Sequence, residues 1–87
     1  MSDYQVILQP SSQKQLKSLS VEITSRILAA IRALATTPRP PGCLKLKGKQ
    51  NQWRIRVSDY RVIYSIDDEN YTLYILTVDH RRSVYER

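Results

Sequence analysis

The sequence contains few of the residues that build disulfides, metal sites or nucleotide-binding loops. Among its 87 residues there are one cysteine, one histidine and two glycines. A single cysteine excludes an intramolecular disulfide, and one cysteine with one histidine does not supply the ligands of a conventional zinc site. Two glycines form neither a GxxxxGKS/T nor a GxGxxG loop, which excludes nucleotide binding of that kind. We expect neither a metal nor another cofactor.

Long apolar runs are also missing. No run approaches the roughly 18 residues that a membrane span needs. The first ten residues, MSDYQVILQP, carry neither the basic nor the apolar region of a secretory signal peptide. Together with the single cysteine, these absences predict a cytoplasmic protein with no membrane partner.

The chain nevertheless contains enough apolar residues for one hydrophobic core. Hydrophobic residues make up 41% of the chain and charged residues 25%, which is ordinary for a globular domain. A chain of 87 residues has no room for two independent cores. We therefore expect residues 1–87 to form a single domain.

Positive charge is concentrated in one third of the sequence. The formal net charge is +6, and residues 39–61 alone contain seven basic residues and one acidic residue. Such a block indicates a phosphate-rich partner, with nucleic acid favoured over a membrane surface because no amphipathic basic helix coincides with it. The alternative is a solvated basic face with no partner.

Apolar spacing and helix caps predict the elements of the N-terminal half. A short β-branched run predicts a strand, and apolar residues at intervals of three and four predict helices. Ser11 or Ser12 is the expected N-cap of the first helix, and Ser20 that of the second. The predicted strand and two helices lie at 3–9, 12–19 and 21–36.

A proline-rich connector at 36–43 leads to a C-terminal half with β-strand periodicity. We expect a short edge strand within 44–50 and three further strands at 52–57, 60–66 and 71–78, followed by a polar tail. The predicted fold class is α+β in the order β-α-α-β-β-β. Its antiparallel sheet has the N-terminal αα-hairpin packed on one face.

The hairpin at 52–66 has a register that the sequence predicts. If Ser58 and Asp59 form a two-residue loop, Arg56 lies opposite Arg61. Alternation then puts Arg54 on the same face. The other face, expected to pack on the helices, carries Trp53, Ile55, Val57, Tyr60, Val62 and Tyr64.

Three arginines on one face of a sheet need an explanation beyond folding. Opposed like charges destabilise a strand pair, and a bound anion would relieve the repulsion. The planar guanidinium donates two hydrogen bonds to one phosphate, which makes phosphate the expected anion. A solvated face with the arginines splayed outward is the alternative.

Further candidate residues follow the last predicted strand. His80 has an unperturbed pKa near neutrality, so it is a candidate for proton transfer, although a structural or exposed role is the more common one. Arg81 follows it directly. Tyr85 is either a stacking platform for a base or an apolar tether for the tail.

Two segments together resemble a known family. The sequence LKLKGKQNQWRIRVSDYRVIYSI, followed by TVDHRRSVYER, is similar to the RelE/ParE superfamily of toxins from bacterial type II toxin–antitoxin pairs. The likeness covers essentially the whole chain and implies a RelE-like fold. Members of the superfamily divide into ribosome-dependent mRNA endonucleases and gyrase poisons. The HRRxxY ending favours the nuclease branch.

For the nuclease branch, the resemblance implies a metal-independent endoribonuclease, an mRNA interferase that cuts mRNA in the ribosomal A site and so inhibits translation. The 2′-hydroxyl attacks the adjacent phosphate and leaves a 2′,3′-cyclic phosphate. Arg54 and Arg56 match the two basic residues of the first hairpin strand, and Arg61 matches the arginine that binds the attacked phosphate. Arg81 matches the residue at the leaving oxygen, and Tyr85 the residue that stacks on a base.

The sequence departs from the nuclease pattern at the residues that would take a proton. The family nuclease has lysines where Arg54 and Arg56 stand, and an arginine stays protonated, which makes it a poor general base. His80, Tyr85 and Lys47 are the alternatives for this role. A further alternative is catalysis by charge stabilisation alone.

The resemblance also implies partners. A RelB-like antitoxin is expected to neutralise the toxin, and the pair is expected to bind operator DNA. On the ribosome, Lys45, Lys47 and Lys49 are the expected contacts to RNA phosphates. Two other functions stay open: a ParE-like gyrase poison without nuclease activity, and an inactive chain that serves only as its antitoxin's DNA-binding partner.

Overall fold

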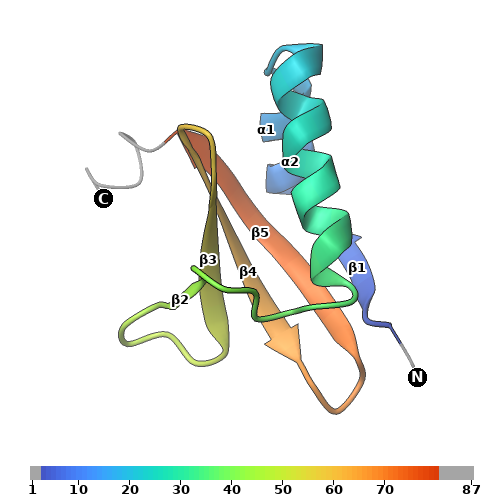
Figure 1. Ribbon diagram of the computed structural model, residues 1–87, viewed down its shortest axis with the longest axis vertical. Helices are drawn as coiled ribbons and strands as arrows, with labels where there is room; N and C mark the ends of the chain where they lie inside the picture. Colours follow the sequence, from blue (N-terminus) through green and yellow to red (C-terminus); the bar gives the residue numbers. More distant parts are fainter. Residues whose placement is uncertain (1–2, 81–87) are drawn as a thin grey trace.

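The computed structural model describes residues 3–80, which form two helices and a five-stranded sheet (Figure 1). The elements in chain order are β1 (Gln5–Leu8), α1 (Pro10–Lys17), α2 (Val21–Leu34), β2 (Leu44–Lys45), β3 (Gln52–Val57), β4 (Tyr60–Asp67) and β5 (Thr72–His80). The predicted α+β class and the helical hairpin on one face are confirmed. Neither helix in this part of the chain is long and apolar enough to cross a membrane.

The sheet is mixed, whereas the sequence predicted an antiparallel one. Its strand order is β1-β5-β4-β3-β2, and β1 pairs with β5 in parallel while the other pairs are antiparallel. The helical hairpin packs on one face and returns the chain to the β1 edge, where the Tyr4 N–H donates to the Ala35 carbonyl at 2.8 Å, and the connector then leads to β2 at the opposite edge (Figure 1). Parallel strands require a long crossover connection, and between β1 and β5 this connection contains both helices and strands β2 to β4.

The first helix begins two residues earlier than predicted. Pro10 occupies its first turn, where the missing N–H costs nothing, and Gln9 is the N-cap residue without a side-chain cap. Ser11 and Ser12 are therefore not caps. The Ser11 hydroxyl donates to the Leu76 carbonyl of β5 at 2.8 Å, and the Ser12 hydroxyl is shared between the Gln9 carbonyl at 2.8 Å and the Ile75 carbonyl of β5 at 3.0 Å.

The second helix agrees closely with the prediction. Ser20 is its N-cap, and its hydroxyl accepts a hydrogen bond from the Ile23 N–H at 3.3 Å. The helix ends at Leu34, two residues before the predicted end. Its apolar stripe of Ile27, Ile31 and Leu34 is fully buried.

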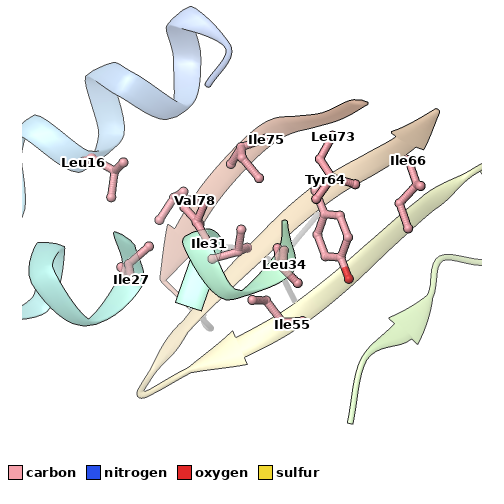
Figure 2. Packing of buried hydrophobic residues seen from close by; sticks show 11 residues of the cluster. Leu16, Ile27, Ile31, Leu34, Ile55, Tyr64, Ile66, Leu73, Ile75 and Val78 are labelled. Atoms are coloured by element: carbon pink, nitrogen blue, oxygen red, sulfur yellow. The ribbon is translucent and has the colours of Figure 1, made fainter. Parts of the chain in front are cut away.

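The core lies between the helices and one face of the sheet (Figure 2). Figure 2 shows Ile31 and Leu34 of α2 directed toward Tyr64 on β4 and Ile55 on β3. Tyr64 is fully buried, and its hydroxyl donates to the Pro38 carbonyl at 2.7 Å, which attaches the proline-rich connector to the core. Burial raises the pKa of Tyr64. We call the helix-covered side of the sheet the inner face and the other side the outer face.

The last strand is longer than predicted. β5 continues through Asp79 and His80, which the sequence placed in the polar tail. β1 pairs only with residues 72–75 of β5, and beyond them α1 lies along the strand edge. Gln15 accepts a hydrogen bond from the Val78 N–H at 2.7 Å and so replaces a neighbouring strand at this position. A β-bulge interrupts the β4–β5 pairing between Ile63 and Tyr64.

Candidate functional site

The β3–β4 hairpin adopts the predicted register. Arg56 lies opposite Arg61, and Ser58 in the two-residue loop has a positive φ of 56°. The six predicted inward residues either belong to the core or pack against it. Because side chains alternate along a strand, the arginines at 54, 56 and 61 share the outer face, and we call these three residues the arginine face.

The three arginines differ in exposure and in neighbours. Arg54 is half-buried between Leu44 on β2 and Ile63 on β4. Arg56 is exposed, and its Nε donates to the Ser58 carbonyl at 3.1 Å, which turns its side chain toward the hairpin loop. Arg61 is only 4% exposed. Since burial reduces screening by water, a phosphate at Arg61 would interact more strongly than one at an exposed arginine.

A carboxylate flanks the central arginine. Asp79 of β5 is the register partner of Arg61 on the side away from Arg56, so the two side chains share the outer face. Asp79 accepts a hydrogen bond from the Gln15 side-chain amide at 3.2 Å. The sequence prediction missed Asp79 because it ended the last strand at residue 78, and it missed Gln15 because the contact joins residues 64 positions apart. Simple alternation would have put Asp79 on the inner face with Leu73 and Ile75, and the β-bulge in the β4–β5 pairing reverses this.

The structure places His80 on the other side of the sheet from the arginine face. It is the register partner of Tyr60, and the two rings meet edge to face with centroids 5.3 Å apart. Tyr60 packs against the core, so His80 lies on the inner side at the end of β5. The structure thus does not bring this candidate for proton transfer together with the arginines.

The basic residues of the β2–β3 segment form a separate surface. Lys45, Lys47 and Lys49 are all exposed. Lys45 pairs with Trp53, and its Nζ lies 6.0 Å from the centre of the Trp53 ring, so it faces the inner side. We call these three exposed residues the lysine surface; they line one shallow pocket, and Lys45 in it faces away from the arginine face.

A polar cluster holds the connector against the sheet. The Arg39 guanidinium forms a salt bridge with Asp68 at 2.9 Å and lies 5.0 Å from the centre of the Trp53 ring. The Tyr4 hydroxyl donates to the same carboxylate. These hydrogen bonds, from Arg39 first and then from Tyr4, lower the pKa of Asp68.

An apolar groove opens on the inner side of the sheet. It has a volume of about 500 Å³ and lies between α2, the connector and β3. Ala33, Pro41 and Val57 line its walls, and Arg56 lies at its edge.

Two predicted site residues, Arg81 and Tyr85, lie outside the described residues.

Comparison with known proteins assigns the family. The family model described as the ParE toxin of type II toxin–antitoxin systems matches residues 6–85. The chain is also similar to Toxin RelG of Mycobacterium tuberculosis, at 31% identity over 97% of this chain and 98% of that protein.

Solved structures give the same result. The archaeal RelE–RelB complex from Pyrococcus horikoshii matches with a TM-score of 0.81 and 31% identity, covering 91% of this chain and 96% of that one. The toxin–antitoxin complex RelBE2 from M. tuberculosis matches with a TM-score of 0.79 and 28% identity, covering 91% and 99%. The chain belongs to the RelE/ParE superfamily of toxins of type II toxin–antitoxin systems.

Proposed function

We propose that this toxin is a ribosome-dependent mRNA endonuclease that cleaves mRNA in the A site by attack of the 2′-hydroxyl on the adjacent phosphate. The observation that carries the proposal is the arginine face. Arg56 and Arg61 lie directly opposite each other, which costs folding energy unless an anion is held there. A phosphodiester that gains negative charge during the attack is such an anion.

The arginines have different roles in this proposal. Arg61 is the most buried, so it stabilises the charge that develops on the attacked phosphate. Arg54 and Arg56 bind the same phosphate or its neighbours from β3. Arg81 would assist the leaving oxygen and Tyr85 would stack on a base, as the family resemblance implies.

The proposal relies on charge stabilisation more than on a general base. Arginines stay protonated at neutral pH, and His80 lies on the inner side against Tyr60. Lys47 belongs to the lysine surface at the β2 edge. Tyr85 is the remaining candidate to take the 2′-hydroxyl proton.

The lysine surface gives the toxin a second way to contact RNA. Three exposed lysines on one segment suit the phosphates of ribosomal RNA, and they lie apart from the face that would hold the mRNA. Binding through phosphates releases counterions, so ribosome binding should weaken steeply with salt. Action on ribosomes would place the toxin in the cytoplasm.

A RelB-like antitoxin is the proposed protein partner. The relatives from P. horikoshii and M. tuberculosis were solved as toxin–antitoxin complexes. The apolar groove beside Arg56 suits an amphipathic segment, and acidic residues of that segment would neutralise the arginine face. Such a segment would fold as it binds. We further propose that the pair, more than the free toxin, binds operator DNA, measurable by gel shift.

Primer extension on an mRNA in a purified translation system tests the proposed activity. New ends should appear only with ribosomes and only with the wild-type toxin, not with Arg61→Ala. The matched family model is that of a ParE toxin, which favours a gyrase poison as the second candidate. A toxin that inhibits gyrase supercoiling and leaves mRNA intact on ribosomes would establish that second function.

A further inference from the structure

The outer face continues beyond the arginine face toward the β4–β5 turn. Its next residues form a row across the sheet, in which each is the register partner of the one before: Gln52 on β3, Ser65 on β4, Tyr74 on β5 and Ile7 on β1. Gln52 lies two residues from Arg54 on the same strand, so the whole row shares the side of the sheet that carries the arginines. The row therefore places one aromatic side chain, Tyr74, on the outer face.

The ring of Tyr74 has no structural partner of the kind that the other tyrosines have. It is half-buried, and within residues 3–80 it neither belongs to the core nor packs on another aromatic ring. The other tyrosines in that range either meet a ring edge to face or lie in the core: Tyr4 with Tyr71, Tyr60 with His80, and Tyr64 in the core. The face of the Tyr74 ring is therefore available to a flat ligand.

A pocket with a volume of about 570 Å³ opens beside this ring, and we call it the turn pocket. Tyr74 lines it from the sheet, Gln50 and Asn51 line it from the loop before β3, and residues 67–69 line it from the β4–β5 turn. The loop is fixed at this point, since the Asn51 carbonyl accepts a hydrogen bond from the Ile66 N–H at 3.0 Å. The turn pocket thus combines an aromatic ring with side-chain amides in a preformed site.

The chemistry of the turn pocket suits a nucleobase better than a phosphate. The carboxylates of the turn repel an anionic backbone, but they accept hydrogen bonds from the amino groups of bases. A side-chain amide such as that of Gln50 pairs with the N6 and N7 atoms of adenine, and aromatic rings are common stacking platforms for single-stranded bases. Adenine fits all of these groups, whereas uracil has no amino group.

The turn pocket is within reach of an RNA that is bound at the arginine face. From Arg54, Tyr74 is two residues along the strands and two strands across, which corresponds to about 12 Å between the Cα atoms. A single-stranded RNA covers this distance within one codon. A phosphate bound by Arg54 therefore leaves a base of the same codon at the turn pocket.

We propose that one base of the cleaved codon stacks on Tyr74 in the turn pocket, that Gln50 binds the edge of this base, and that adenine is preferred to uracil there. This inference rests on the proposed nuclease function, because it assigns a specificity site to that reaction. Stacking orients the RNA on the arginine face, so a codon with the preferred base is cleaved faster.

Cleavage of mRNAs that carry adenine or uracil at each position of the A-site codon tests the proposal. At one position, kcat/KM of the wild-type toxin should be about tenfold higher for adenine than for uracil. Tyr74→Leu should lower kcat/KM on the adenine codon by about tenfold, because stacking is lost, and Tyr74→Phe should not. Gln50→Ala should lose most of the preference and still cleave the uracil codon at the wild-type rate.

Two matched controls separate base binding from general effects. Tyr71→Leu removes an exposed ring from the neighbouring turn, and Gln13→Ala removes an α1 amide that donates to the Leu8 carbonyl at 2.8 Å. Both should keep the wild-type preference. The proposal is overturned if folded Tyr74→Leu cleaves the adenine codon like the wild type, if Gln50→Ala keeps the full preference, or if the wild type cleaves without preference.

A second measurement does not depend on cleavage. A trinucleotide of 2′-deoxyadenosine cannot be cleaved, because it lacks the attacking hydroxyl. Added to the full-length toxin, it should shift the NMR resonances of the Tyr74 ring, assigned by comparison with Tyr74→Phe, and a 2′-deoxyuridine trinucleotide should shift them less. Unshifted ring resonances would overturn the proposal. If the wild-type toxin cleaves no mRNA, the proposed function fails, while this titration still decides whether Tyr74 binds a base.

Discussion

The two faces of the β3–β4 hairpin have opposite physical characters. The inner face carries Ile55, Val62 and Tyr64, all buried against the helices, and its pairs stabilise the fold. The outer face carries the three arginines of the arginine face, and the opposed charges of Arg56 and Arg61 do not stabilise the fold. Since alternate residues of one strand serve the two faces, neighbouring substitutions should separate function from stability.

The largest expected effect is the loss of cleavage in Arg61→Ala. Removing one group that stabilises developing charge typically costs about 100-fold to 1,000-fold in kcat. Ribosome-dependent cleavage measures this, and circular dichroism confirms the fold. A variant that cleaves normally, or one that is unfolded, would contradict the role given to Arg61.

A substitution on the inner face should instead lower stability and leave cleavage nearly unchanged. Leu73 is fully buried on β5, and Leu73→Ala should lower the free energy of unfolding by about 2–5 kcal/mol, because it loses burial and leaves a cavity. Chemical denaturation measures this. Below its unfolding transition the variant should still cleave at a rate near that of the wild type. A large kcat loss in the folded variant would show that the faces are not separable.

The opposed arginines predict a small gain in stability. Arg56→Gln removes the repulsion across β3 and β4, so the free energy of unfolding should rise by about 0.2–1 kcal/mol at low salt. The gain should shrink in 1 M salt, because the charges are then screened. Cleavage should fall at the same time. Arg32→Gln, an exposed change on α2, is the control with no strand neighbour.

The register of the β3–β4 hairpin and the two faces that it creates were predictable from the sequence. A two-residue loop and strict alternation determine which residues of 52–66 face each other, and all six inward residues follow from that. The parallel pairing of β1 with β5 was not predictable, because no local pattern reports which distant strands pair. Serine is a favoured N-cap residue, but the hydroxyls of Ser11 and Ser12 donate hydrogen bonds to carbonyls of β5.

Some residues of the candidate site could likewise be predicted from local sequence, and others could not. The arginine face follows from one hairpin and was predicted from spacing. Asp79 and Gln15 were missed because their contact joins residues 64 positions apart. His80 was one of the candidates for taking the 2′-hydroxyl proton. The bulge between Ile63 and Tyr64 and the length of β5 instead place it opposite Tyr60, on the inner side.

The smallest expected effect concerns the polar cluster far from the arginine face. Hydrogen bonds from Arg39 and Tyr4 lower the pKa of Asp68 below its value in the unfolded chain. A lowered pKa in the folded state contributes stability above about pH 4, and that contribution is lost as the pH falls through the folded-state pKa. In Asp68→Asn the unfolding free energy should therefore decline less between pH 7 and pH 2.5.

Urea denaturation at the two pH values measures the decline, with Asp59→Asn as the control for loss of an exposed turn carboxylate. Because Asp68 is more than half exposed, solvent screens the pair and the difference should be small. An equal decline in both variants would mean that the cluster holds the connector by geometry alone. Ribosome-dependent cleavage at neutral pH should be unchanged in Asp68→Asn, since the cluster lies at the opposite end of β4 from Arg61.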